Sequence, residues 1–131
     1  MIRIVIVTHG RLAKELVETA RLIFGRLDGV HDINLPQDRD VNDLKAELAS
    51  VMSAAGTDPV VILTDMYGGS AFMAAVVHAA GPDRMLVAGA NLPLLMDILC
   101  ARDGGADLAA LRSSVEANKE RYLVLYKEPQ K

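Results

Sequence analysis

The opening stretch of the chain, residues 1–25, reads MIRIVIVTHGRLAKELVETARLIFG. Its β-branched run IRIVIV at residues 2–7 indicates a strand, and the amphipathic run at residues 12–25 indicates a helix. The segment IVIV has no polar alternation, which is typical of a strand covered on both faces, as in a parallel sheet flanked by helices. This stretch therefore predicts an open α/β fold.

The alternation of strand and helix continues along the chain. Further strands are predicted at residues 30–35, 59–64 and 84–89, and further helices at residues 41–56, 70–81 and 92–102. Each of the first three helical patterns is closed by a glycine, Gly25, Gly56 or Gly81, and a glycine in the left-handed conformation is a common helix end. We expect one domain over residues 1–131, with helices on both faces of a mainly parallel sheet.

The C-terminal part is ambiguous. The helix-like run DLAALRSSVEANKE at residues 107–120 is followed by RYLVLYKEP, whose aromatic and β-branched residues fit either a continued helix or a last strand. We favour a strand in this last segment. A strand that leaves the domain in this way is able to pair with a second subunit, and the modest core of a domain this short also favours a dimer.

Composition excludes several classes of function. The formal net charge of −3 comes from interspersed residues, and five aromatic residues without a basic groove do not indicate a nucleic-acid partner. The single Cys100 cannot form an internal disulfide, and no stretch is long enough to span a bilayer. We expect a cytoplasmic protein.

Two loops at the ends of predicted strands carry reactive groups. His9 lies in the turn Thr8-His9-Gly10-Arg11 after the first strand, and Asp65 begins the segment DMYGGS after the third. A neutral imidazole offers one nucleophilic nitrogen, and an aspartate that accepts the other N–H fixes the tautomer and stabilises positive charge. If the strand order is 2-1-3-4, these loops flank the point where strand order reverses, the usual site in such sheets.

The glycines after Asp65 suit a phosphate. Gly68 and Gly69 let the backbone approach closely, and backbone N–H groups at a helix start bind anions. Ser70 is predicted either to cap the helix or to donate to a phosphate oxygen. Singly, a loop histidine or an aspartate before Gly-Gly-Ser has an ordinary structural explanation; their combination favours phosphoryl transfer. No acidic or histidine cluster has metal-ligand spacing, so we predict no metal.

Three segments, IVIVTHGRLAKEL, VVILTDMYGGSAFMAA and VAGANLPLLMDIL, resemble in order and spacing the mannose-type enzyme IIA family of the bacterial sugar phosphotransferase system. The resemblance implies a phosphotransferase with a sheet of order 2-1-3-4 and a homodimer completed by an exchanged C-terminal strand at residues 122–126. It implies that His9 is phosphorylated and that Asp65 is its hydrogen-bonding partner. It also implies a phosphate pocket and a nearby edge shaped by Thr64, Gly68, Gly69, Ser70, Asn91 and Pro93.

By the same resemblance, phosphate arrives from the phosphocarrier HPr and leaves to an enzyme IIB during sugar uptake. No soluble cofactor is implied, and contact with a membrane is only indirect, through a permease complex. The chain departs from the family's commoner G-G-S-P-F-N-A at Ala71 and Met73, and has Tyr67 where Trp is frequent, which bears on partner choice or transfer rate. The identity of the sugar is not encoded in this domain.

Other functions use related chemistry. A regulatory module, phosphorylated on His9 but controlling a target protein without sugar transport, is not separable by sequence. The phosphotransfer subunit of dihydroxyacetone kinase shares the first-strand histidine but is expected to read closer to MDLGS after the third strand. A receiver domain phosphorylated on Asp65 needs Mg²⁺ held by acids after the first strand, where this chain has Thr8 and His9.

Overall fold

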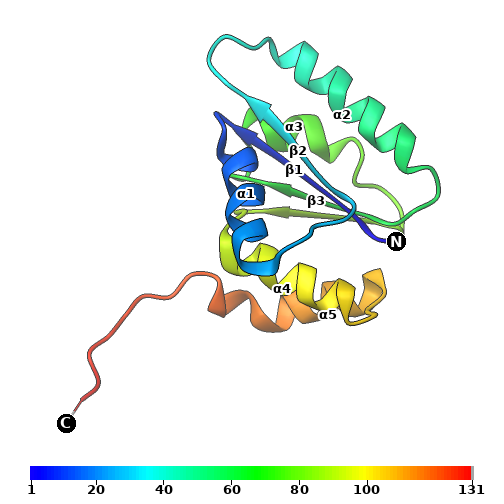
Figure 1. The fold of residues 1–131 in the computed structure, drawn as a ribbon. Coiled ribbons are helices and arrows are strands. Elements are labelled where there is room, and N and C mark those ends of the chain that lie inside the picture. Colours follow the sequence, from blue (N-terminus) through cyan, green and yellow to red (C-terminus); the bar gives the residue numbers. More distant parts are fainter. Residues whose placement is uncertain (131) are drawn as a thin grey trace.

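The computed structural model describes residues 1–130, in which a four-stranded sheet lies between two layers of helices (Figure 1). The strands are β1 (Arg3–His9), β2 (Val30–Leu35), β3 (Val60–Thr64) and β4 (Arg84–Ala88). The helices are α1 (Leu12–Phe24), α2 (Val41–Ala55), α3 (Ser70–Val76), α4 (Leu92–Asp103) and α5 (Leu108–Asn118), followed by the short 3₁₀ helix η1 (Lys119–Arg121). Among residues 1–130, no helix combines the length and apolar character needed to cross a membrane.

All strands are parallel and lie in the order β2-β1-β3-β4, which confirms the predicted sheet. The central strand β1 pairs with β2 from Ile4↔Val30 to His9↔Leu35, and with β3 up to Val7↔Thr64. The carboxyl ends of β1 and β3 are therefore neighbours at the point where strand order reverses, which is where ligand and reaction sites form in open parallel sheets.

The apolar run of β1 contributes to two cores, one on each face of the sheet. Ile4 and Ile6 belong to the core beneath α1, α4 and α5, whereas Val5 and Val7 belong to the core beneath α2 and α3. Successive side chains of a strand point to opposite faces, so a strand covered by helices on both sides has no position for a polar residue. This arrangement explains why residues 4–7 are apolar without alternation.

The third helix is shorter than its sequence pattern. It ends at Val76 rather than near residue 81, because its last turn tightens into hydrogen bonds of the i→i+3 type, His78 N–H to Ala75 C=O and Ala79 N–H to Val76 C=O. Gly25 and Gly56 cap α1 and α2 with positive φ, as predicted. Gly81 also has positive φ, but it lies in the loop before β4, so its predicted capping role is wrong.

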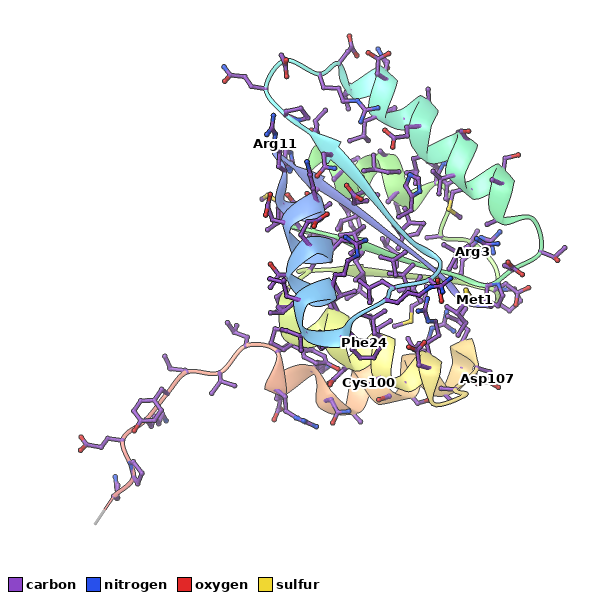
Figure 2. All side chains as sticks on the ribbon, in the orientation of Figure 1. Met1, Arg3, Arg11, Phe24, Cys100 and Asp107 are labelled. Carbon is purple, nitrogen blue, oxygen red and sulfur yellow. The ribbon has the colours of Figure 1, made fainter. Side chains whose placement is uncertain are left out.

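The predicted strand at residues 122–126 is not formed within the single chain. Residues 124–130 leave the domain as an irregular segment with no secondary structure, at the lower left of Figures 1 and 2. A strand requires a neighbouring edge for its backbone N–H and C=O groups, and this segment runs away from its own sheet. Its apolar side chains are exposed, namely Leu123, Val124, Leu125 and Tyr126.

Candidate functional site

His9 is the last residue of β1 and is held by the elements on either side of it. The next residue, Gly10, has φ of 58° and donates its N–H to the carbonyl of Leu35 at 2.8 Å. On the other side, the buried Thr8 hydroxyl accepts the N–H of Ala13 at 2.7 Å and so fixes the start of α1. The backbone around His9 is therefore rigid, while its side chain is 43% exposed to solvent.

Asp65 follows β3 and contacts His9 twice. Its Oδ2 accepts the backbone N–H of His9 at 2.9 Å and lies 2.9 Å from the ring Nδ1 of the same residue. Its other oxygen, Oδ1, accepts the backbone N–H of Met66 at 3.0 Å. The carboxylate is only 13% exposed, so both of its oxygens are committed to this one turn of the structure.

These contacts decide which ring nitrogen of His9 is free. Burial raises the pKa of the Asp65 carboxyl, whereas the hydrogen bonds from the backbone N–H and the ring of His9 lower it. The lowering is the larger effect, so the pKa lies below its ordinary value. An ionised carboxylate only accepts hydrogen bonds, so Nδ1 of His9 carries the proton that it donates. Nε2 then keeps its lone pair, which makes it the nucleophilic atom of the site.

Gly69 stands directly beside the imidazole. A Cβ at this position would lie 3.1 Å from Cε1 of His9 and 3.1 Å from Cγ of Met66, which is closer than nearly all Cβ contacts. Gly69 is also the N-cap of α3, with an ordinary extended backbone. Sequence reasoning proposed this glycine for close approach to a phosphate but missed its clearance for the histidine ring, because a Gly-Gly pair does not reveal what each residue faces.

Two other predicted site residues are placed differently from expectation. Ser70 is the first residue of α3 and does not cap it, so its predicted capping role is wrong, and its side chain is exposed beside the site. Thr64 is fully buried and its hydroxyl has no hydrogen-bond partner among the described residues. It supports the site from beneath, because its carbonyl accepts the N–H groups of Gly89 and Ala90 at 2.9 and 2.8 Å.

Asn91 and Pro93 lie at the start of α4. The Asn91 side chain accepts the N–H of Leu94 at 3.0 Å and so caps the helix, with Pro93 in the first turn, where its missing N–H leaves no bond unmade. The Asn91 amide also donates to the carbonyl of Tyr122 at 2.8 Å. Sequence reasoning did not find this second contact, since nothing in the pattern brings residue 122 close to residue 91.

Exposed apolar side chains adjoin the site. They lie in the loop after β3 and along α3, and together we name them the α3 surface: Met66, Tyr67, Met73, Val76 and Val77. The rings of Tyr67 and Phe72 pack at a centroid distance of 4.9 Å, which links the loop to the helix. Apolar side chains clustered on a surface are typical of a contact with another protein.

Comparisons with known proteins agree on one family. A family model described as the fructose IIA component of the phosphotransferase system matches residues 3–116. The mannose-specific EIIAB component of Escherichia coli strain K12 is 33% identical over 98% of this chain, and the chain spans 41% of that curated relative's length. The fructose-specific EIIA component of Bacillus subtilis is 28% identical over 79% of this chain and 72% of its own length.

Solved structures show the same fold. A phosphotransferase system component EIIA from Streptococcus agalactiae superimposes with a TM-score of 0.82 at 26% identity, covering 95% of this chain and 96% of that one. The mannose/sorbose-specific IIA subunit from Enterococcus faecalis also gives a TM-score of 0.82, at 22% identity, over 98% of this chain and 96% of that one.

Proposed function

Because this chain belongs to the IIA component family of the sugar phosphotransferase system, and so to a family of phosphoryl carriers, we propose that it accepts its phosphate on Nε2 of His9. We further propose that the phosphate comes from phospho-HPr and passes to an enzyme IIB. The observation that carries the first proposal is the hydrogen bond between Nδ1 of His9 and Oδ2 of Asp65 at 2.9 Å.

The transfer is a displacement at phosphorus. The Nε2 lone pair forms a new N–P bond while the N–P bond to the donor's histidine breaks, and the donor's ring nitrogen recovers its electron pair. Positive charge develops on the His9 ring, and the Asp65 carboxylate stabilises it through the Nδ1–H hydrogen bond. Passing the phosphate on reverses these steps, so one pair of residues serves both transfers.

The phosphoryl oxygens need donors beside Nε2. We assign this role to backbone N–H groups of Gly68 and Gly69, together with the Ser70 backbone and hydroxyl, because Gly69 contacts the ring and Ser70 is exposed next to it. Gly68 has φ of 80°, a conformation that turns the loop and that side chains rarely adopt. Thr64 shapes this pocket from beneath rather than by direct contact.

Replacing Gly69 with alanine is expected to slow phosphorylation of His9 by about tenfold or more, because the added methyl displaces the ring from its position against Asp65. The initial rate of phosphate incorporation measures this loss. Gly104→Ala is the matched control: its Cβ would also be tight, 3.2 Å from the carbonyl of Cys100, but at the distant end of α4. The control should lose stability and keep the rate; equal rates in both variants would contradict the assignment.

We propose that the α3 surface receives the partner proteins. It is apolar, exposed and continuous with the loop that holds Asp65, and a phosphoryl group moves between proteins only where the two active sites meet. Met73 lies on this surface at a position where the family resemblance leads us to expect Asn, so the surface also bears the chain's own partner preference, whereas Ala71 is fully buried beneath it. Transient contacts of this kind are small, so a few side chains should carry most of the affinity.

Met73→Gln is expected to raise the KM for phospho-HPr by about five- to tenfold, which corresponds to roughly 1 kcal/mol of lost apolar contact, while the maximal rate and the melting temperature stay unchanged. Leu22→Gln is the control, since Leu22 is 88% exposed at the far end of α1. Steady-state transfer kinetics with varied phospho-HPr measure both. A KM that rises equally in the two variants would show a general surface effect instead.

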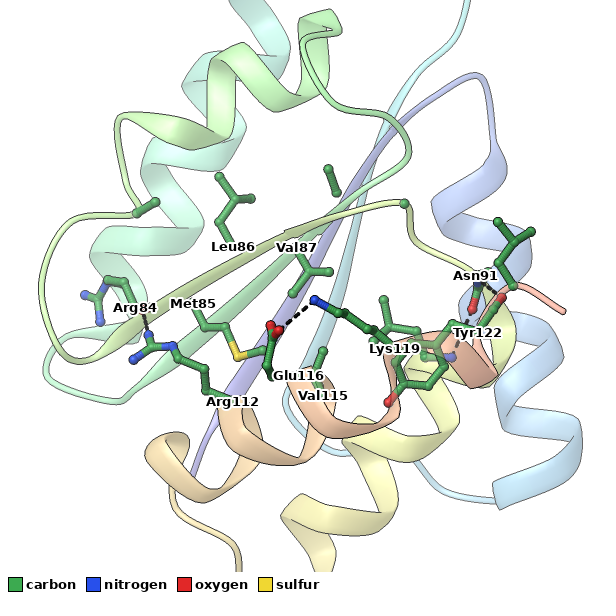
Figure 3. Close-up of a pocket in the computed structure, with 15 residues that line it drawn as sticks. Arg84, Met85, Leu86, Val87, Asn91, Arg112, Val115, Glu116, Lys119 and Tyr122 are labelled. Atoms are coloured by element: carbon green, nitrogen blue, oxygen red, sulfur yellow. Dashed lines mark hydrogen bonds and ion pairs between the residues drawn. The ribbon is translucent and has the colours of Figure 1, made fainter.

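We also propose a homodimer completed by the C-terminal segment. The edge strand β2 has polar His31, Asp32 and Asn34 among its apolar residues. The other edge strand, β4, is apolar from Met85 to Ala88 and ends the sheet without a further strand among residues 1–130. A cavity of about 830 Å³ runs along β4 and α5 (Figure 3). The exposed apolar residues 123–126 of a second subunit are suited to pair with this open edge.

The proposed function is tested by reconstitution. The protein is incubated with phosphoenolpyruvate, enzyme I and HPr, and intact mass reports the phosphate. We expect one acid-labile phosphate per chain, none when HPr alone is omitted, and its loss when an enzyme IIB is added. Phosphate without HPr would remove HPr as donor; no phosphate under any condition would overturn the carrier function for this chain.

A further inference from the structure

The side chain of Asn91 makes two hydrogen bonds in opposite directions. Its Oδ1 accepts the N–H of Leu94 at the start of α4, and its Nδ2 donates to the carbonyl of Tyr122 at the end of η1 (Figure 3). Ser, Thr or Asp would cap the helix equally well, but none of these offers an amide that donates while its oxygen caps. The choice of asparagine at this position is therefore explained by the Tyr122 contact and not by the cap.

Tyr122 is the point at which the C-terminal segment leaves the domain. Its ring packs against the core formed by α1, α4 and α5, whereas the next residue, Leu123, is 87% exposed. Among residues 1–130, no hydrogen bond involves a residue beyond Tyr122. The Asn91 amide thus holds the last anchored residue of the chain.

The loop that carries Asn91 also supports the phosphorylation site. Gly89 and Ala90 both donate their N–H groups to the carbonyl of Thr64, and Thr64 directly precedes Asp65. Asp65 in turn holds both the backbone and the ring of His9. Gly89, Ala90 and Asn91 form one loop, whose first two residues bind the carbonyl of Thr64 and whose last residue binds the carbonyl of Tyr122. The loop therefore joins the end of η1 to the pair Asp65 and His9.

We propose that Asn91 is a positioning residue: it clasps the C-terminal segment to the loop that supports Asp65, so that releasing the segment loosens the hydrogen bond between Asp65 and His9. The effect on phosphorylation rests on the function proposed above; the effect on the Asp65–His9 hydrogen bond does not. We name the hydrogen bond between Asn91 and Tyr122 the clasp. It makes the geometry of the site depend on whether Tyr122 is held against Asn91.

Asn91→Asp tests the clasp, because aspartate keeps the helix cap and replaces the donor to Tyr122 with a carboxylate that repels its carbonyl. Asn42→Asp, the same substitution in the first turn of α2, is the control, since its side chain makes no described hydrogen bond. Hydrogen exchange at residues 119–122 should rise by about fivefold or more in Asn91→Asp only, the loss expected for one hydrogen bond.

Tyr122 supplies a second readout. Burial raises the pKa of its hydroxyl to about 12, and the nearby Asp97 carboxylate acts in the same direction, although the hydroxyl has no partner at hydrogen-bonding geometry. In Asn91→Asp the alkaline tyrosine titration should lose its component near pH 12. An unchanged titration and unchanged exchange would overturn the clasp.

The link to the site is read from the Nδ1–H proton of His9 by NMR and from the initial rate of phosphorylation. We expect faster exchange of that proton and a rate about three- to fivefold lower in Asn91→Asp, with the control unchanged. A released segment with an unaltered His9 proton would overturn the link, whether or not the protein is phosphorylated. Should Asn91→Asp fold poorly, Asn91→Ser, which also caps the helix without donating to Tyr122, replaces it in all three measurements.

Discussion

Replacing His9 with alanine is expected to reduce phosphorylation by the HPr relay from one phosphate per chain to none. Nε2 is the ring nitrogen that keeps its lone pair once Nδ1 is held by Asp65, the His9 side chain is 43% exposed, and the Asp65 carboxylate stabilises the resulting charge. The fold should persist, because the backbone N–H of residue 9 still donates to Asp65 and the ring is partly exposed. Intact mass and circular dichroism measure both results.

The two other histidines are the controls for this prediction. His31 faces Glu47 at 3.5 Å on the edge strand β2, and His78 lies in the turn after α3. Neither has a carboxylate that holds one ring nitrogen within a rigid turn, so His31→Ala and His78→Ala should each retain one phosphate. Phosphate that survives in His9→Ala and disappears in either control would place the acceptor elsewhere.

Replacing Asp65 with asparagine is expected to slow phosphorylation of His9 by about 10² to 10⁴-fold, up to the loss known for replacing the carboxylate that fixes the tautomer of a reacting histidine by an amide. The amide oxygen cannot occupy both carboxylate positions. If it faces His9, its NH₂ group opposes the N–H of Met66; if it faces Met66, the NH₂ group forces the proton of His9 onto Nε2. Single-turnover transfer from phospho-HPr gives the rate directly.

Asp58→Asn is the matched control, because Asp58 pairs with Arg3 at the opposite end of the sheet. Its transfer rate should equal that of wild type.

Acid unfolding provides a further check on Asp65. The lowered pKa of this carboxyl means that its contribution to stability is present above the ordinary aspartate value of about 4 and is lost as the pH falls below it. Wild type should therefore lose stability below pH ~4 more steeply than Asp65→Asn.

The sheet was predictable from sequence because its signal is local. Residues 4–7 alternate between two cores, and only a strand covered on both faces is apolar at every position. The pairing of His9 with Asp65 was also within reach, since parallel strands bring their carboxyl ends to one edge. Its atomic form was not: that Oδ2 also accepts the backbone N–H of His9 depends on a register that no residue pattern encodes.

Features that depend on distant contacts escaped prediction. The end of α3 at Val76, where the last turn tightens into i→i+3 hydrogen bonds, could not be predicted because the composition of residues 77–80 is still compatible with a helix. Thr64 belongs to the family's motif, yet its side chain is buried in the interior. Its backbone carbonyl makes the contacts near the site, because it accepts the N–H groups of Gly89 and Ala90. Residues 122–126 have strand composition but need a sheet edge, and none lies beside them within the described chain.

We propose above all that Asp65 holds Nδ1 of His9 and leaves Nε2 to take the phosphate. The direct test labels the histidines with ¹⁵N, phosphorylates the protein through HPr, and assigns the phosphorylated nitrogen from correlations of the ring ¹⁵N nuclei with ring protons and phosphorus. We expect a single phosphorylated nitrogen, Nε2 of His9, with Nδ1 still protonated. Phosphate on Nδ1 of His9, or on His31 or His78, would contradict it.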